Sequence, residues 1–275
     1  MSCFHGLQQG VYKEKLILPS WLTNITICGE DRDNTIITWD DHANIKMPTG
    51  GLDSEAAVKG KPMGTFRTYT LKVQGSYITL KNITIENNAA KLGQAVSLHL
   101  EGDHILVQNC RLLGNQDTVY TGIANNRSAF YDCYIEGTTD FIFGPGRAWF
   151  ENCEIRSKAN SYITAASSPA GQEYGYVFNK CKLTAEPGVD KVYLGRPWRP
   201  YAATLFMNCE MGSHIRPEGW HNWGKQSNEQ TARYSEYNNH GSGAATKARV
   251  AWSRQLTKKE AAKVTIKNVF GEEAW

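Results

Sequence analysis

The amino-acid sequence predicts an all-β chain wound into a parallel β-helix. Three features lead to this prediction: a cysteine that returns at regular intervals, short strands in which apolar and polar residues alternate, and the lack of the 3.6-residue periodicity that amphipathic helices show. A return distance of about 20 to 50 residues marks a solenoid, in which each coil packs on the next.

Five segments share one layout, in which a cysteine precedes an alternating strand. They are VQNCRLLG (107–114), FYDCYIEG (130–137), FENCEIRS (150–157), VFNKCKLT (177–184) and FMNCEMGS (206–213). Their cysteines, Cys110, Cys133, Cys153, Cys181 and Cys209, are 23, 20, 28 and 28 residues apart. ITICGEDRDNTIIT (25–38) and ITLKNITIEN (78–87) alternate in the same way, with Asn, Asp or Gly at the turns, so we expect them to form earlier coils.

In a stacked solenoid these cysteines would lie one above another, about 4.8 Å apart, as an internal ladder of small apolar groups. A metal site is disfavoured, because zinc ligands come in close pairs such as C-x₂-C and the sequence contains none. Disulfides are not required. Seven cysteines are an odd number, so at least one thiol stays free in a monomer, which is the state that we expect.

The C-terminal stretch from about Gln226 to Trp275 departs from the repeat. Within SRQLTKKEAAK (253–263), Thr257 is a suitable helix N-cap and Glu260 follows three residues later, ahead of an alanine-rich run. We therefore expect an irregular tail with a short helix that packs against the side of the β-helix. Residues 1–275 are expected to form one domain, because elongated folds of this length commonly do.

Composition and charge exclude several classes of protein. The formal net charge of +3 comes from 30 basic and 27 acidic residues mixed along the chain, without the basic blocks that indicate nucleic-acid or membrane-surface binding. No apolar run approaches the roughly 18 residues of a membrane span, and MSCFHGLQQG at the N-terminus lacks the features of a signal peptide. The 11% aromatic content is compatible with stacking on sugar rings, although core packing is the commoner role of any single ring.

Two aspartates stand at the same offset from the cysteines of successive coils. Asp117, in GNQDTVY, lies seven residues after Cys110, and Asp140, in GTTDFIFG, lies seven residues after Cys133. Equal offsets on stacked coils predict two carboxylates close together on one face. Such a pair does not ionise twice easily, so it separates into an acid and a base or nucleophile. Turn aspartates more often cap backbone amides, but these two adjoin apolar and aromatic residues, where an unpaired carboxylate is costly.

A third segment, YLGRPWRP (193–200), supplies Arg196 and Trp198 on a later coil. An arginine near a buried carboxylate would keep it ionised through a bidentate bond, and a tryptophan could stack on a sugar ring. Alone this segment is a weak indication, because an arginine at the surface is more common.

The motifs closely resemble those of the pectinesterase family, the pectin methylesterases. GNQDTVY, DFIFG and YLGRPW match in the family's order, supported by GTFRTYT (64–70), GQAVSL (93–98) and EGWHNW (218–223). The resemblance extends from about Gly10 to Trp275. It implies a right-handed, single-stranded parallel β-helix of the pectin lyase-like type, and hydrolysis of the methyl ester at C6 of galacturonate units in pectin, with release of methanol.

The family's site residues carry over to positions in this sequence. The resemblance implies Asp140 as nucleophile, Asp117 as general acid/base, Gln116 and Gln94 as oxyanion-stabilising amides, and Arg196 as the residue that orients the nucleophile. It implies substrate contacts from Thr65, Gln94, Tyr120, Phe143, Arg196 and Trp198. No metal or organic cofactor is implied, and the partner is the pectin (homogalacturonan) chain, in pectin catabolism or cell-wall modification.

The N-terminus departs from the family pattern. Family members usually begin with a secretion signal, a strand and a helix before a segment like GVYKEKLILP, which starts here at Gly10. We therefore expect the first coil and its capping helix to be missing or replaced by MSCFHGLQQ. The resemblance nevertheless implies a secreted protein, extracellular or periplasmic.

Two other functions remain open from the sequence. The first is another polysaccharide enzyme on the same solenoid, a lyase or a glycoside hydrolase, which would shorten the polysaccharide. A lyase of this shape would need a calcium-binding acidic cluster with a catalytic Arg or Lys, whereas the two aspartates here are accompanied by glutamines. A β-helix without catalytic activity could serve as a carbohydrate-binding or adhesion module.

Overall fold

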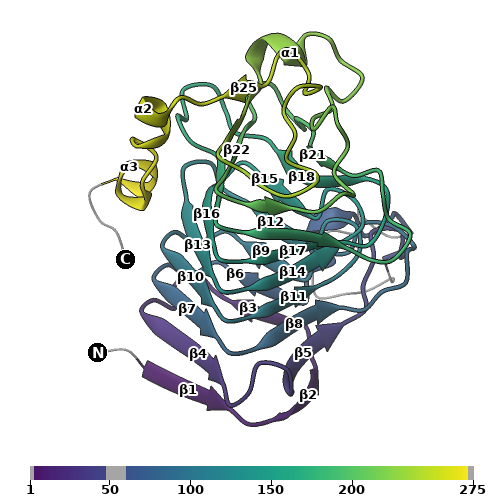
Figure 1. The fold of residues 1–275 in the computed structure, drawn as a ribbon. Helices are drawn as coiled ribbons and strands as arrows, with labels where there is room; N and C mark the ends of the chain where they lie inside the picture. Colours follow the sequence, from purple (N-terminus) through teal and green to yellow (C-terminus); the bar gives the residue numbers. More distant parts are fainter. Residues whose placement is uncertain (1–2, 48–59, 272–275) are drawn as a thin grey trace.

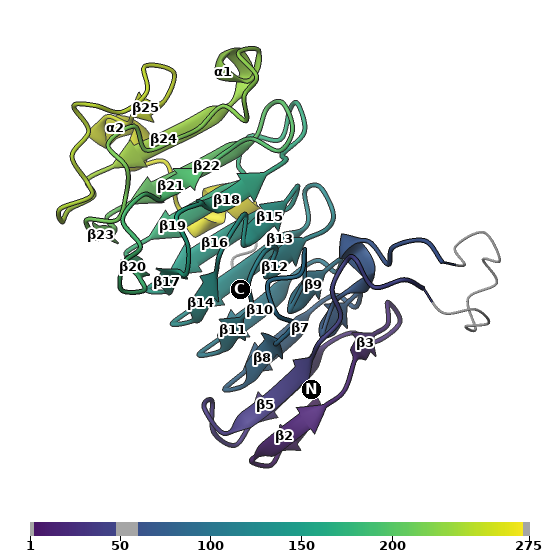
Figure 2. The same ribbon diagram turned by 90° about the vertical axis from the view of Figure 1, so that its right-hand side faces the viewer.

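The computed structural model describes residues 3–47 and 60–271, in which the strands form three parallel sheets of ten, eight and seven strands, named here sheets A, B and C. Each strand pairs with its counterpart one coil later, as β7 (Ile78–Lys81) does with β10 (Ile105–Gln108). The chain therefore passes through all three sheets in every coil and rises as a right-handed parallel β-helix, which confirms the predicted fold class (Figure 1). Figure 2 shows the coils stacked from the N-terminal end to the C-terminal end.

The strands fall into three columns. Sheet A contains β1 (Cys3–Leu7), β4 (Ile25–Gly29), β7, β10, β13 (Arg127–Tyr131), β16 (Arg147–Glu151), β19 (Tyr176–Asn179), β22 (Ala203–Met207), β24 (Arg233–Tyr237) and β25 (Arg254–Gln255). Sheet B contains β2 (Gly10–Lys13), β5 (Thr35–Trp39), β8 (Thr84–Asn87), β11 (Arg111–Leu113), β14 (Tyr134–Gly137), β17 (Glu154–Ser157), β20 (Lys182–Ala185) and β23 (Glu210–Met211). Sheet C contains β3 (Leu16–Leu18), β6 (Leu71–Val73), β9 (Leu98–Leu100), β12 (Val119–Thr121), β15 (Ile142–Gly144), β18 (Tyr162–Ala166) and β21 (Tyr193–Gly195). The helices are short: η2 (Thr65–Arg67), α1 (Asn228–Thr231), α2 (Lys258–Ala261) and α3 (Ile266–Phe270).

The repeated cysteine marks the corner between sheets A and B. In all five coils the residue before it has a positive φ, for example 49° at Asn109 and 55° at Asn152. Asparagine and aspartate tolerate this left-handed conformation better than most residues, which explains their frequency at the corner. The corner side chains also bond between coils, since Asn109 Nδ2 donates to Asn82 Oδ1 at 2.9 Å. The Asn-Cys dipeptide is therefore a turn signal as well as a core signal.

The cysteine ladder predicted from the spacing is present in the core. The five corner cysteines are buried, and their thiols lie against backbone carbonyl groups of the preceding coil, as Cys153 Sγ does at 3.5 Å from the carbonyl oxygen of Phe130. All six cysteines whose side chains the structure describes carry free thiols. Burial raises the pKa of four of these thiols, which include Cys133 and Cys153, so they pack as small apolar groups.

A stack of phenylalanines runs beside this ladder on the inner face of sheet A. Phe130, Phe150, Phe178 and Phe206 occupy one register row, and their ring centroids are 4.5, 4.3 and 4.3 Å apart. All four rings are fully buried. Stacked coils therefore convert a sequence repeat into a continuous apolar core.

The β-helix extends further than the break expected near Gln226. β24 pairs with β22 over five residues, and β25 pairs with β24. The corner of this coil has Asn238 in the left-handed conformation, followed by Asn239 where the other coils have cysteine. The Oδ1 atom of Asn239 accepts a hydrogen bond from the amide of Cys209 at 2.9 Å. Because the cysteine is absent, the spacing that identified the other coils did not reveal this one.

The helical part of the tail packs on the outer face of sheet A. Thr257 and Glu260 form the expected capping box at the start of α2. In α3, Val269 and Phe270 are buried against apolar residues of β13, β16, β19 and β22, and Arg147 donates to the carbonyl oxygen of Val269 at 3.0 Å. The short α3 helix therefore packs against the side of the β-helix, as predicted from the sequence for the tail (Figure 1).

Residues 3–18 form the first coil that the structure describes. β1, β2 and β3 pair with β4, β5 and β6, respectively. The apolar side chains of this end, including Leu7, Leu16 and Leu18, are only partly buried, as are Ile25 and Ile27 of the next coil, whereas Ile78 and Leu80 of β7 are fully buried. Two expectations remain predictions: that residues 1–275 form one domain, and that the first coil usual in the family is missing or replaced.

Candidate active site

Asp117 and Asp140 occupy equivalent positions on adjacent coils. β12 and β15 pair with Val119 opposite Ile142, and each aspartate stands two residues before its strand. The amide of Asp117 donates to the carbonyl oxygen of Thr139 at 3.1 Å, which joins the two turns directly. Both aspartates have left-handed backbones, with φ of 67° and 50°, and both line one pocket on the outside of sheet C. The two side chains therefore enter the same pocket from adjacent turns.

Arg196 holds the carboxylate of Asp140 at two points. Its Nε donates to Oδ1 at 3.0 Å and its Nη2 donates to Oδ2 at 2.7 Å. The guanidinium carbon lies 3.9 Å from the ring centroid of Tyr162 and 3.7 Å from that of Trp223. The cation is thus enclosed by two aromatic faces, an arrangement that fixes its orientation and that of the carboxylate.

The same coil geometry brings Arg196 to the aspartates. The amide of Arg196 donates to the carbonyl oxygen of Thr164 at 2.9 Å and that of Trp198 to Ala166 at 3.0 Å, so the chain continues alongside β18 after β21 ends. In sheet C, β15, β18 and β21 are consecutive neighbours. Asp140 precedes β15 and Arg196 follows β21, so these two residues, 56 positions apart in the sequence, are only two strands apart across sheet C.

The environments of the two carboxyl groups differ. Burial, reinforced by the neighbouring charge of Asp140, raises the pKa of Asp117 well above its usual value, and the more distant Arg196 opposes this only in part. Burial also raises the pKa of Asp140, but its hydrogen bonds and ion pair with Arg196 act against that rise. These shifts favour the protonated form of Asp117 over that of Asp140.

The pocket around this pair has a volume of about 190 Å³. Of the residues named from the sequence, it is lined by Thr65, Gln94, Gln116, Asp117, Asp140, Phe143, Arg196 and Trp198. Tyr120 is the exception: it lies beside the pocket as the neighbour of Phe143 in the same register row of sheet C, 4.8 Å from Phe66 and 4.7 Å from Phe143 by ring centroids. Three further lining residues, Phe66, Ala165 and Trp223, were not named as site residues.

Sequence signals existed for two of these three. Phe66 follows Thr65 within GTFRTYT, and Trp223 ends EGWHNW, both motifs that the resemblance includes. Ala165 carries no chemical signal, because it faces the pocket only through its register with Phe143 in β15.

The two glutamines come from neighbouring turns. The amide of Ala95 donates to the carbonyl oxygen of Gln116 at 3.0 Å, which places Gln94 and Gln116 side by side on successive coils. Both side chains line the pocket. Within the described parts of the chain, no hydrogen bond joins either carboxamide to another protein group, so both can offer N–H donors to a bound molecule.

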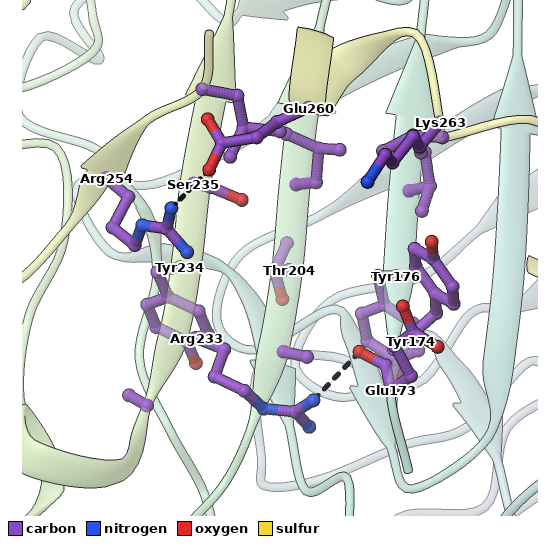
Figure 3. Close-up of a pocket in the computed structure, with 17 residues that line it drawn as sticks. Glu173, Tyr174, Tyr176, Thr204, Arg233, Tyr234, Ser235, Arg254, Glu260 and Lys263 are labelled. Carbon is purple, nitrogen blue, oxygen red and sulfur yellow. Dashed lines mark hydrogen bonds and ion pairs between the residues drawn. The ribbon is translucent and has the colours of Figure 1, made fainter.

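A larger depression of about 390 Å³ lies on the outer face of sheet A, beneath α2 (Figure 3). Both arginines that line it are already engaged: Arg254 pairs with Glu260 at 2.6 Å, and Arg233 donates to the carbonyl oxygen of Glu173 at 2.8 Å. We therefore assign it to the contact between the C-terminal segment and the β-helix.

Two further observations concern the described residues 3–47 and 60–271. No three His, Cys, Asp or Glu side chains in them are grouped so that they could hold a metal ion. None of their helices has the length and apolar character that crossing a membrane would need.

A pocket that holds a clamped carboxylate, a second carboxyl group with a raised pKa, two carboxamides and aromatic walls, on the outside of a β-helix, defines a class of protein: an enzyme that works with carboxyl groups. Relatives identify the family. The model of the family described as Pectinesterase matches residues 4–273. Pectinesterase 31 of Arabidopsis thaliana is 37% identical over 257 residues, which cover 93% of this chain and 78% of the relative.

Solved structures agree. Pectin methylesterase from carrot superposes with a TM-score of 0.87 at 29% identity, over 99% of this chain and 85% of the carrot chain. A pectin methylesterase solved in complex with a hexasaccharide superposes with a TM-score of 0.82 at 27% identity, over 100% of this chain and 90% of the other. The chain belongs to the pectinesterase family and is accordingly a carboxylic ester hydrolase.

Proposed function

We propose that this chain hydrolyses the C6 methyl esters of galacturonate units in pectin, with Asp140 as nucleophile and Asp117 as general acid and base. The observation that carries the proposal is the two-point clamp of Arg196 on Asp140, beside Asp117, a carboxyl group whose pKa burial raises well above its usual value. The match to the Pectinesterase family and the relative solved with a hexasaccharide support the choice of substrate.

The nucleophile must be ionised and correctly aimed. Arg196 supplies both conditions, because it favours the charged form of Asp140 and binds both of its oxygens. Attack by one Asp140 oxygen on the ester carbonyl carbon forms a tetrahedral intermediate, in which the carbonyl oxygen becomes an oxyanion. The carboxamide N–H groups of Gln94 and Gln116 are the donors proposed to meet this charge.

The leaving group needs a proton. Asp117, whose proton is retained by burial and by the charge of Asp140, donates it to the departing methoxide as the intermediate collapses. Methanol leaves, and the galacturonate carbonyl is joined to Asp140 as a mixed anhydride.

Water completes the cycle. Asp117, now a carboxylate, accepts a proton from a water molecule as that water attacks the acyl carbonyl carbon. Collapse of the second intermediate breaks the bond to Asp140 and releases the galacturonic acid unit. Both carboxyl groups return to their initial states, so the pair alone balances the protons.

The aromatic walls are the proposed binding surface for the sugar chain. Phe143 and Trp198 line the pocket directly, and the Tyr120 ring packs beside Phe143. Thr65, Gln94 and Arg196 add polar groups near the reacting ester. Apolar ring faces next to a few polar groups suit a polymer of sugar rings with carboxyl substituents. Action on pectin outside the cell, in its breakdown or in cell-wall modification, accords with this surface.

The test is an assay on highly methylated pectin that measures released methanol and, in parallel, the length of the polymer. The proposal expects methanol release in step with new carboxyl groups and an unchanged chain length. New reducing ends would indicate a glycoside hydrolase, and unsaturated ends a lyase. Binding to pectin without any product would indicate a carbohydrate-binding module.

A further inference from the structure

Glu236 interrupts the apolar core in an unusual way. It follows Phe206 in the register row of stacked phenylalanines, so a carboxylate stands where a further ring would continue the stack. Its exposed fraction is 1%. A buried carboxylate is costly unless it is paired and hydrogen-bonded, and this position is therefore expected to have a specific partner.

The partner is Arg249, whose side chain is 3% exposed. Arg249 Nε donates to Glu236 Oε1 at 2.8 Å and Nη2 donates to Oε2 at 3.2 Å. Nη1 donates to the carbonyl oxygens of Arg216 and Pro217 at 3.1 and 3.0 Å, and Nη2 also donates to that of Gly243 at 2.8 Å. All five N–H groups of the guanidinium are thus used, and two of them bind the backbone at 216–217.

Glu236 holds the same segment at a second point. Its Oε1 also accepts a hydrogen bond from Trp220 Nε1 at 3.3 Å, and the Trp220 indole stacks on Tyr234 with centroids 4.3 Å apart. Residues 216–220 are therefore attached to the buried pair through backbone carbonyls at one end and through an indole at the other.

From this anchor the chain proceeds directly to the candidate active site. The amide of Leu194 donates to the carbonyl oxygen of Gly219 at 2.7 Å, and the amide of His221 donates to that of Gly195 at 3.1 Å, so the segment lies beside β21. Two residues after His221, the Trp223 ring covers the guanidinium of Arg196 at 3.7 Å. Arg196 in turn clamps Asp140.

We propose that the buried Glu236–Arg249 pair is a positioning device for the reaction, which holds residues 216–223 so that Trp223 fixes Arg196 against Asp140. The inference rests on the proposed function, because the residue that it positions is the proposed nucleophile. Neither Glu236 nor Arg249 lines the pocket, so both are positioning residues.

Arg249→Lys and Glu236→Gln in the full-length chain test the device. Lysine keeps the charge but cannot make five bonds, and glutamine keeps the shape but loses the charge. Both variants are expected to lose about ten- to hundredfold in activity, mostly in kcat, because displacement of a nucleophile by a fraction of an ångström to 1 Å has effects of this size. The loss in Arg249→Lys should be the larger, and the acidic limb of the pH profile should move to higher pH, because a loosened clamp no longer favours the Asp140 carboxylate.

Hydrogen exchange supplies a measurement that does not depend on activity. In Arg249→Lys the amides of Leu194 and His221 should exchange faster, whereas those of β13 stay protected. Val269→Ala is the matched control: it removes buried contacts of α3 on the outer face of sheet A, away from the pocket in sheet C, and should lower the melting temperature without moving kcat or the acidic limb.

Two results would overturn the inference: wild-type kcat and acidic limb in both folded variants, or unchanged exchange at Leu194 and His221. If one variant fails to fold, the other decides. Absence of methanol release by the wild-type chain would remove the proposed function instead, and the exchange measurement would still test the anchor.

Discussion

The guanidinium of Arg196 donates two hydrogen bonds to the carboxylate of Asp140, at 3.0 and 2.7 Å, across 56 residues of sequence. This relationship separates the roles of the two aspartates. Arg196 favours the ionised form of Asp140, and the resulting negative charge disfavours ionisation of Asp117. Burial raises the pKa of both carboxyl groups, and the ion pair with Arg196, which opposes this rise mainly at Asp140, makes the two groups unequal.

Arg196→Lys tests the clamp. Lysine retains the charge but presents a single ammonium group, so it loses both the two-point contact and the stacking between Tyr162 and Trp223. We expect kcat for methanol release to fall about a hundredfold, with the acidic limb of the pH profile shifted to higher pH. A variant with wild-type rates would exclude the clamp as a catalytic requirement.

Asp140→Ala tests the nucleophile. Removal of the attacking group should lower kcat by at least about a thousandfold, because no second group can form the acyl intermediate. Far-ultraviolet circular dichroism should match that of the wild type, since the residue lies outside the core. Retained turnover by a correctly folded variant would contradict the assignment.

Asp117→Asn tests the acid. Asparagine cannot give a proton to methoxide, so methanol release should fall by about a hundredfold or more. In the wild type, acylation should slow as the pH rises through the raised pKa of Asp117, and this alkaline limb should disappear in the variant. Stopped-flow measurement of methanol release between pH 4 and pH 9 distinguishes these outcomes. An alkaline limb that persists in the variant would point to another group.

The same substitution predicts a change in stability with a defined sign. Below the unfolded-state pKa of about 3.9, Asp117 is protonated in both states, and the variant should match the wild type. As the pH rises, the unfolded chain ionises while the folded chain retains the proton, so the folded wild type loses stability until its raised pKa is passed. Asp117→Asn avoids this loss. Its free energy of unfolding in urea should exceed that of the wild type by an amount that grows from pH 4 to pH 7, and a constant difference would contradict the raised pKa.

Phe178→Ala tests the stack in the core. The ring lies between Phe150 and Phe206, with both centroids at 4.3 Å, so its removal leaves a cavity that stacked coils cannot easily close. We expect a loss of about 3 to 5 kcal/mol in the free energy of unfolding. Val11→Ala, at a side chain that is 69% exposed, should change it by less than about 0.5 kcal/mol. Similar values for both variants would show that the stack contributes little.

Sequence periodicity determined the fold and part of the site. Each of the five corners combines a left-handed residue with a buried cysteine, and the regular return of that cysteine allowed the repeat to be recognised without any structure. The equal offset of Asp117 and Asp140 from their cysteines placed both carboxyl groups at equivalent positions on adjacent coils. The residues that produce this pattern lie within a single coil, and stacking repeats the same coil one step further along the axis of the β-helix.

Tertiary structure decided what periodicity does not encode. The coil with Asn239 in place of cysteine, the position of Trp223 over Arg196 and the pairing of Glu236 with Arg249 all depend on loops of irregular length between coils. The register of such loops is set by hydrogen bonds such as that from Leu194 to Gly219, which join residues far apart in the sequence. The sequence alone predicted that Asp117 and Asp140 would lie close together. Only the tertiary structure, in which Trp223 of the 216–223 segment covers Arg196, decided how Asp140 is held as a carboxylate, because its ion pair with Arg196 requires three-dimensional alignment.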